Sequence, residues 1–327
     1  MQEAIDFVIT WVDGEDPIWQ EEKAKYSDVG SDKRKSRFRD WDQLRFWFRA
    51  VEKFAPWVNK IHFVTFGHLP KWLDLSNPKI NVVKHEDFIP KEFLPVFNST
   101  AIEVHLHRIP NLSSQFVYFC DDFYLMRPCK PKDFFKKGKP VDIAKIVAIP
   151  PHNNEMYYYH LYNDYSLYRQ YATKKKVFKS FFKYVNFRYG LTAFSNLFNV
   201  LTKNTYFYSL HLPIALLKDT MDKVWEMHGD TLEKTARSKF RQITDNSLEA
   251  FRGYQLVTGN FCPRNKKGIV LNTREAKYTK TVIENCKYKL MCLSDNSQDC
   301  DFEEHKMIIN EAFEKIFPQR SMFELED

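Results

Sequence analysis

The chain has little glycine, with 9 glycines and 15 prolines in 327 residues, and this disfavours long disordered linkers. None of its six cysteines form CxxC pairs, so a zinc site is not expected. No run approaches the roughly 18 apolar residues of a membrane helix. No charged and then apolar leader precedes the strand-like run that starts at Ile5. These absences favour a cytoplasmic protein with free thiols.

Aromatic residues are abundant at 16%, and much of the excess lies between Tyr157 and Phe207. Hydrophobic residues make up 44% and charged residues 28%, which is typical of a globular chain long enough for a sizeable core. The net charge of +7 fits anionic ligands or an anionic membrane surface. It is too small to indicate nucleic-acid binding without an accompanying motif.

Apolar runs of strand length alternate with helical patterns along the first part of the chain. The sequence predicts strands at 5–11, 60–66, 80–83 and 115–120, and helices at 41–54 and 100–107. This alternation predicts an α/β fold, with a mostly parallel nucleotide-binding sheet and helices on both faces. We expect three regions: an α/β core that binds a nucleotide sugar at 1–150, an aromatic and basic helical insertion at 151–207, and the remaining core with a closing helix at 208–327.

Carboxylates follow several of these strands, at the edge where parallel sheets bind ligands. Asp121 and Asp122 come directly after the apolar run that ends at Cys120. Magnesium is often shared between one or two carboxylates and substrate phosphates, so the pair predicts a metal site. The alternative is a solvated turn. Asp13 follows the first strand, where the backbone of 10–12 could contact a base; the alternative is a polar turn.

A histidine and several arginines complete the set of candidate residues. His211 precedes a proline at a predicted helix start, where it could act as an acid or base or simply cap the helix. Guanidinium groups bind phosphate in a fork, which makes Arg39 near one helix start and Arg241 in a predicted helix at 240–258 candidates for substrate contact. Asn98 precedes another helix, where it could favour an anion or cap the helix.

The stretch from Tyr157 to Tyr189 interleaves aromatic residues with lysines and arginines. Lysines could meet anionic head groups while aromatic side chains enter the membrane interface. The alternative is a packed helical subdomain with a basic outer face.

Four sequence blocks together resemble the Stealth family of hexose-1-phosphate transferases, which includes bacterial polysaccharide phosphotransferases and the catalytic subunit of GlcNAc-1-phosphotransferase. The blocks are the run from Ile5 to Pro17, the long segment from Arg37 to Arg127, His211-Leu212-Pro213, and Phe240-Arg241 with Asp245. Family members usually carry asparagine before the two aspartates, where this chain has Cys120.

The resemblance implies transfer of a sugar-1-phosphate from a UDP-sugar to a hydroxyl of a lipid-linked or polymeric glycan, with release of UMP. It assigns Asp121 and His211 to catalysis. It assigns a Mg²⁺ or Mn²⁺ ion to Asp122 with Asp121. Substrate contacts fall to Thr10, Trp11, Val12, Asp13, Arg39, Asn98, Arg241 and Asp245.

The implied setting is synthesis of capsular or cell-surface polysaccharide at the inner face of a bacterial plasma membrane. Two other functions use the same residues. A metal-dependent glycosyltransferase would attack the anomeric carbon and release UDP, and a non-catalytic scaffold would bind glycans without turning them over. Neither the sequence nor the resemblance indicates a nucleic-acid partner.

Overall fold

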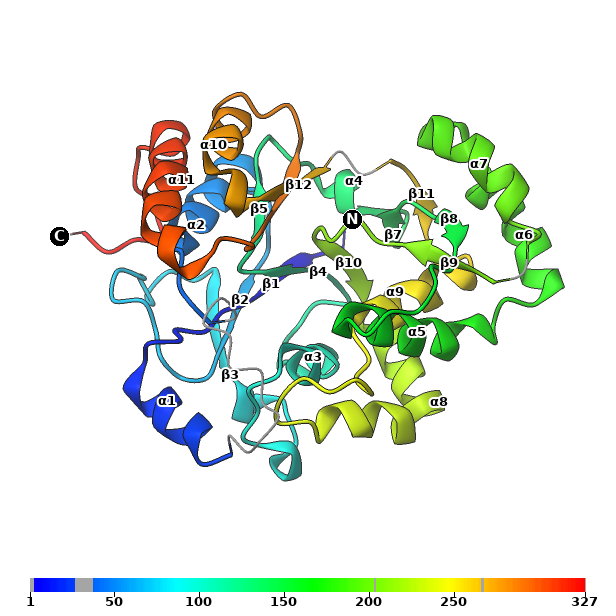
Figure 1. Cartoon of the computed structure of the whole chain (residues 1–327), viewed down its shortest axis with the longest axis horizontal. Coiled ribbons are helices and arrows are strands. Elements are labelled where there is room, and N and C mark those ends of the chain that lie inside the picture. Colours follow the sequence, from blue (N-terminus) through cyan, green and yellow to red (C-terminus); the bar gives the residue numbers. More distant parts are fainter. Residues whose placement is uncertain (1–2, 27–37, 203, 266–267, 327) are drawn as a thin grey trace.

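The computed structural model describes residues 3–26, 38–202, 204–265 and 268–326. A central five-stranded sheet runs through the middle of the molecule (Figure 1). The order of its strands is β10 (Ile214–Leu217), β4 (Gln115–Cys120), β1 (Ile5–Thr10), β2 (Ile61–Thr65) and β3 (Ile80–Lys84). Strands β1 to β4 are mutually parallel, and only β10 runs antiparallel to its neighbour β4. The mostly parallel sheet predicted from the sequence is confirmed.

Helices cover both faces of this sheet, as predicted. Phe7 and Ile9 of β1 join a core with helices α2 (Leu44–Phe54), α10 (Ala276–Glu284) and α11 (Phe302–Ile316). Val8, which points to the other face, joins a second core with α3 (Ser99–Glu103), α8 (Lys218–Ala236) and α9 (Leu248–Val257). Burial on both faces explains why these strands read as continuous apolar runs rather than as alternating ones.

Smaller sheets surround the central one. A three-stranded sheet contains β12 (Gly268–Asn272), β13 (Leu290–Ser294) and β5 (Phe123–Leu125), and α10 connects β12 to the parallel β13. A second contains β11 (Cys262–Pro263), β7 (Lys139–Asp142) and β6 (Phe135–Lys136), next to the short helix α4 (Pro131–Phe134). Strands β8 (Lys145–Ala148) and β9 (Thr205–Tyr208) form an antiparallel pair at the two ends of the next region.

The expected helical insertion lies between β8 and β9. It contains α5 (Met156–Arg169), α6 (Lys174–Tyr184) and α7 (Leu191–Asn199). Helix α5 packs on α9, where Gly253 lies so close to the Tyr168 ring that an added Cβ would meet it at 2.2 Å. Helices α6 and α7 extend away from the central sheet, at the right of Figure 1. The division at residues 150 and 207 stays a prediction.

Several helix predictions differ from the structure. The helix predicted at 41–54 begins only at Leu44. The helix predicted at 100–107 is the short α3 followed by a separate 3₁₀ turn at Leu106–Arg108. Arg241 lies in a loop rather than a helix, because α9 begins only at Leu248. His211 precedes strand β10 and not a helix. Pro213 is compatible with either, because its missing N–H is tolerated at a strand start as well as at a helix start.

Helix α1 (Pro17–Ala24) follows the first strand and begins at the cap residue Asp16, whose carboxylate accepts a hydrogen bond from Trp19 N at 2.7 Å. Arg37, which opens the second resembling block, lies outside the described residues.

Candidate active site

The C-terminal edge of the central sheet brings the predicted catalytic residues together. Parallel pairing of β1 with β4 places Thr10 beside Cys120, so Asp121 and Asp122 leave the sheet next to the end of β1. In the antiparallel pair of β10 and β4, Ile214 lies opposite Tyr118. Beyond this pair, the donor atoms of His211, Asp122 and Cys120 lie within 4.8 Å of one another. Two segments far apart in the sequence therefore meet at the edge where such sheets bind ligands.

Four carboxylates influence one another at this edge. Asp121 is accessible to solvent, but other protein groups, including the Asp40 carboxylate, surround it. Loss of hydration, and then the Asp40 carboxylate, raise its pKa to about 6. Burial, followed by the charges of Asp121 and Asp295, raises the pKa of Asp122 well above its ordinary range. Arg241 opposes both shifts. Negative charge gathered in this way is suited to a cation.

His211 has an unusual backbone conformation, with a φ of 46°. Residues other than glycine seldom adopt this region, and they often do so at functional sites. The imidazole lies edge-on to Phe123, with ring centroids 5.0 Å apart. Burial lowers the pKa of His211, and Arg241 acts in the same direction against Glu249. The ring is therefore predominantly neutral at neutral pH and can accept a proton or bind a metal ion.

Arg241 reaches the site from a loop that is fastened to the start of α3. Its guanidinium donates to Ser99 Oγ at 2.7 Å. Behind it, Asn98 Nδ2 donates to Asp245 Oδ2 at 2.8 Å, and both side chains are buried. The same Asp245 oxygen accepts a hydrogen bond from Gln242 N at 2.9 Å. The structure thus brings the three predicted residues together, with Arg241 half-exposed and the other two supporting it from the interior.

A hydrogen-bonded chain beside the site was not anticipated from the sequence. Tyr118 Oη donates to Glu103 Oε1 at 2.9 Å, and Thr10 Oγ1 lies 3.0 Å from the same hydroxyl. Burial raises the pKa of Glu103 to about 7, although the nearby Arg241 favours its charged form. Tyr118 lies within the apolar run Phe116–Cys120, which predicts only a core residue. A glutamate that titrates near neutral pH next to Arg241 is a further functional candidate.

The predicted nucleotide-binding turn lies beside the ends of β1 and β2. Trp11 stacks on Phe63 with centroids 5.7 Å apart, and Asp13 N donates to His68 Nε2 at 2.8 Å. Burial raises the pKa of Asp40, and the charge of Asp13 adds to the shift. Gly14 is required here because a Cβ would come within 2.0 Å of the Phe38 carbonyl oxygen. Thr10, Val12 and Asp13 are half-buried, and their contact with a nucleotide stays a prediction.

Arg39 is clamped to the C-terminal segment of the chain. Its Nε and one terminal nitrogen donate to the two oxygens of Asp295, at 2.7 and 2.5 Å, and its other terminal nitrogen donates to Asp299 at 3.1 Å. The guanidinium also lies over the Phe302 ring. These contacts place Arg39 next to the acidic cluster and hold Asp295 near Asp122. Its predicted role in phosphate binding remains a prediction.

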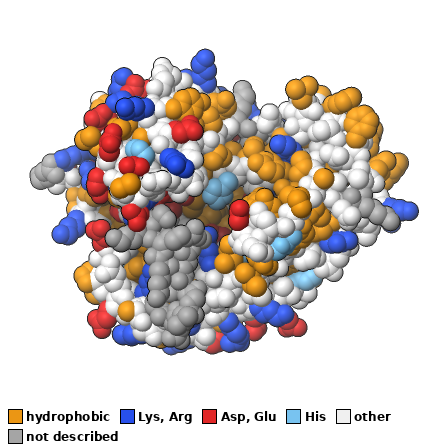
Figure 2. All heavy atoms as spheres, viewed as in Figure 1, with side chains coloured by type: hydrophobic (Ala, Val, Ile, Leu, Met, Phe, Trp, Pro, Cys, Tyr) orange, Lys and Arg blue, Asp and Glu red, His pale blue; other side chains and the backbone are white. Residues whose placement is uncertain are grey.

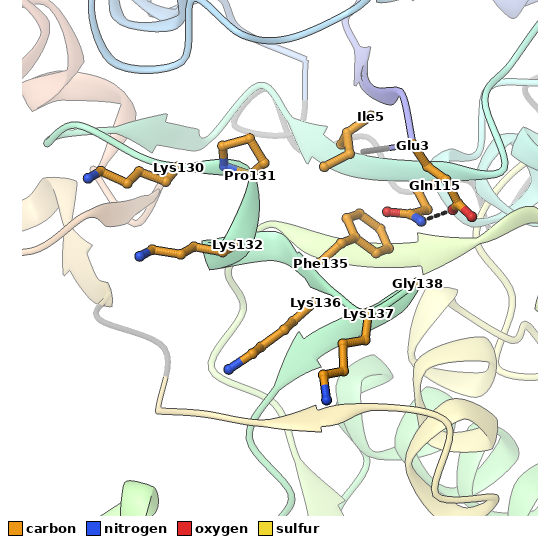
Figure 3. Close-up of a pocket in the computed structure, with 10 residues that line it drawn as sticks. All are labelled: Glu3, Ile5, Gln115, Lys130, Pro131, Lys132, Phe135, Lys136, Lys137 and Gly138. Carbon is orange, nitrogen blue, oxygen red and sulfur yellow. Dashed lines mark hydrogen bonds between the residues drawn. The ribbon is translucent and has the colours of Figure 1, made fainter. Parts of the chain in front are cut away.

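A pocket of about 550 Å³ lies at the opposite edge of the sheet (Figure 3). It is lined by Ile5 and Gln115, where β1 and β4 begin, and by residues of the segment Lys130–Gly138. Four lysines extend around it, and Gln115 donates to Glu3 across its far side. The pocket contains none of the predicted site residues, so its location does not coincide with the carboxylate cluster.

The residues at the catalytic edge fit a divalent cation. Donor atoms of Cys120, Asp122 and His211 lie within 4.8 Å of one another. Carboxylate oxygens suit Mg²⁺ and Mn²⁺, and an imidazole nitrogen suits Mn²⁺ among other transition metals. Asp122 and His211 would hold such an ion, and Asp121 would remain open to solvent. A parallel sheet whose C-terminal edge carries carboxylates, an imidazole and an arginine is typical of enzymes that act on phosphorylated ligands.

Comparison with known proteins defines the family. The sequence models of Stealth protein CR1, conserved region 1, and Stealth protein CR2, conserved region 2, match residues 3–28 and 37–142. The capsular polysaccharide phosphotransferase WcwK of Streptococcus pneumoniae is 36% identical over 325 residues, which cover 98% of each chain. The exopolysaccharide phosphotransferase cps2G of Lactiplantibacillus plantarum is 37% identical over 98% of this chain and 96% of its own. The chain belongs to the Stealth family.

The receptor polysaccharide phosphotransferase WefC of Streptococcus oralis is also similar, with 36% identity over 98% of this chain and 99% of its own. Among solved structures, the galactosyltransferase LgtC covers 94% of this chain and 95% of its own, with a TM-score of 0.42 and 10% identity. That structural likeness is too weak to carry an argument.

Proposed function

We propose that the protein transfers a sugar-1-phosphate from a UDP-sugar to a hydroxyl of an acceptor glycan in the synthesis of capsular or other cell-surface polysaccharide. The observation that carries the proposal is the meeting of Asp121, Asp122, His211 and Arg241 at one edge of the sheet. The full-length similarity to polysaccharide phosphotransferases supports the same reaction class.

In this reaction the acceptor oxygen attacks the phosphorus atom that carries the sugar. A new bond forms between that oxygen and phosphorus, and the bond from phosphorus to the UMP oxygen breaks, so that UMP leaves with the electron pair. Asp121 accepts the proton of the acceptor hydroxyl, because it is the solvent-accessible member of the carboxylate pair. Arg241 stabilises the negative charge of the equatorial phosphoryl oxygens.

A divalent cation, Mg²⁺ or Mn²⁺, is part of the proposal. Bound by Asp122 and His211, it would neutralise phosphate charge that the four carboxylates would otherwise repel. Ser99 holds the Arg241 guanidinium, and the pair formed by Asn98 and Asp245 holds the loop that carries it. These chain residues therefore set the position of the positive charge opposite the carboxylates.

The nucleotide product tests the reaction. The purified protein is incubated with a panel of UDP-sugars, Mg²⁺ or Mn²⁺ and an acceptor oligosaccharide, and UMP is separated from UDP by chromatography. We expect UMP in amounts equal to the phosphodiester formed. UDP as the product would show attack at the anomeric carbon and would replace the proposal by the glycosyltransferase alternative.

Two aspartate variants separate an enzyme from a scaffold. Asp121→Asn should lower the rate of UMP formation on the order of a thousandfold, as loss of a general base does. Asp219→Asn is the matched control, because that carboxylate lies on α8 with 84% of its side chain exposed. The same Asp121→Asn variant can replace the unmodified protein in the cells that produce it. If those cells made normal polysaccharide, the scaffold alternative would be favoured and the proposed chemistry would be wrong.

A lipid-linked or polymeric glycan is the acceptor class that fits the similarity to capsular and exopolysaccharide phosphotransferases. We place the reaction at the inner face of the plasma membrane, where such carriers are extended. No helix among the described residues is long and apolar enough to cross a bilayer.

A further inference from the structure

Helices α6 and α7 expose an unusual number of large apolar side chains. Together with the turn between them they form the α6–α7 hairpin, defined here as residues 174–201. Leu191 is 92% exposed, Phe178 85% and Phe182 82%. The exposed apolar residues of the hairpin are Phe178, Phe182, Phe187, Leu191, Phe194, Leu197, Phe198 and Leu201. Figure 2 shows orange side chains gathered at the upper right of the molecule, over these helices.

The exposed side chains fall on one surface of each helix. Phe178 and Phe182 are four residues apart on α6. Leu191, Phe194 and Phe198 follow helical spacing along α7. Residues three and four positions apart share a helix face, so each helix presents a continuous apolar surface to water. A soluble monomer rarely exposes a contiguous patch of this kind without a binding role.

The side of the hairpin that faces the protein combines apolar packing with hydrogen bonds. Val177 and Val200 pack against a small core cluster that contains Tyr184. Asn196 is fully buried, accepts a hydrogen bond from Ile146 N at 2.9 Å and donates to Ala144 O. Tyr184 is buried and donates to Leu256 O at 2.9 Å. Lys183 Nζ donates to the carbonyl oxygen of Gly259 at 2.6 Å. The hairpin is thus fixed to the core by hydrogen bonds and by these few apolar contacts, while its phenylalanine and leucine side chains remain exposed.

The charge around the exposed apolar residues indicates what kind of partner binds this surface. The sequence contains no Asp or Glu between Asp164 and Asp219. The hairpin itself carries exposed basic residues next to the apolar ones: Lys174, Lys175, Lys179 and Arg188. A second copy of the chain docked on the same surface would bring these like charges together. Anionic lipid head groups complement them, and the acyl region accepts the phenylalanines.

We propose that the α6–α7 hairpin is an interfacial anchor that inserts its phenylalanine and leucine side chains into the surface of an anionic bilayer. The basic residues contact lipid phosphates at the rim of the inserted surface. Because Asn196, Tyr184 and Lys183 fix the hairpin to the body, insertion also fixes the orientation of the protein on the membrane. This inference does not depend on the proposed reaction, although it places the protein where lipid-linked acceptors are found.

Vesicle sedimentation tests the anchor. Full-length protein is mixed with sucrose-loaded vesicles of phosphatidylcholine alone or of phosphatidylcholine with phosphatidylglycerol. We expect co-sedimentation with the mixed vesicles and weaker binding to the neutral ones. Phe182→Glu/Phe194→Glu should lower the partition coefficient on the order of a hundredfold, since two large apolar side chains no longer leave water. Both side chains are exposed, so the variant should fold normally. An unchanged melting temperature would verify this.

The matched control is Tyr278→Glu/Met307→Glu. It makes the same charge change at exposed apolar residues of α10 and α11, and it should bind vesicles like the unmodified protein. Lys175→Gln/Lys179→Gln should weaken binding to the mixed vesicles only.

Three results would overturn the anchor. The unmodified protein could fail to sediment with either vesicle, the phenylalanine variant could bind as well as the control, or light scattering could show a dimer that the phenylalanine variant dissociates. Equal binding to both vesicle types would overturn the role of the basic residues. No sugar donor or acceptor enters this assay, whereas the UMP measurement with a soluble acceptor tests the reaction without vesicles.

Discussion

The buried pair Asn98 and Asp245 should stabilise the protein and act on catalysis only through Arg241. Asn98→Ala removes the 2.8 Å bond to the Asp245 carboxylate and the cap on the Thr100 N–H of α3. A hydrogen bond to a charged group contributes about 1.5–3 kcal/mol and a helix cap about 1 kcal/mol. We therefore expect a loss of about 3 kcal/mol in the free energy of unfolding.

Asp245→Ala should cost a similar amount, because its Oδ2 also accepts hydrogen bonds from Thr100 and Gln242. Urea unfolding followed by tryptophan fluorescence measures both single variants and the double variant. Since the two residues share one bond, the double variant should lose about 2 kcal/mol less than the sum of the single losses. Simple additivity of the three free energies would refute the direct contact.

Turnover measurements then separate support from substrate contact. Arg241→Gln should lower kcat on the order of a hundredfold, as loss of one charge-stabilising group does. If Asn98 acts by holding the Arg241 loop, adding Asn98→Ala to Arg241→Gln should lower kcat little further. A full additional loss in the combined variant would instead show that Asn98 contacts the substrate itself.

Further outcomes follow from other parts of the structure. Gly253→Ala should lower the free energy of unfolding by about 1–3 kcal/mol in urea titrations, because its Cβ would overlap the Tyr168 ring. Burial lowers the pKa of His105 to about 3, so the unfolded chain gains a proton below about pH 6.5 while the folded protein does not; stability should fall by about 2 kcal/mol at pH 5, and His105→Phe should remove this part of the pH dependence. Removal of metal with EDTA should abolish UMP formation, and added Mn²⁺ or Mg²⁺ should restore it.

The predictable part of the fold is the part that repeats a simple pattern. Continuous apolar runs such as Phe116–Cys120 identify strands buried on both faces, and the alternation with helices is enough for a parallel sheet. Asp121 and Asp122 follow such a run, so their position at the C-terminal edge could also be predicted. The antiparallel direction of β10 could not, because a short apolar segment after His211 reads equally well as a helix or a strand.

The supporting contacts of the site depend on tertiary partners that no local pattern specifies. Glu103 stands three residues after Thr100, a spacing typical of a helix capping box. In the structure it instead accepts a hydrogen bond from Tyr118 of strand β4. Asn98 and Asp245 are predicted to contact substrate, and their burial against each other is visible only after the fold has joined the two segments. Pair contacts across long stretches of chain cannot be read from one sequence without related sequences to compare.

The pairing of β10 with β4 has a consequence for the order of events during synthesis. These neighbouring strands are separated by about a hundred residues, a long-range contact of the kind that slows folding. His211 and Asp122 can come together only after the whole intervening segment, including the helical hairpin, has left the ribosome. A chain that ends before His211 therefore lacks the complete set of candidate catalytic residues.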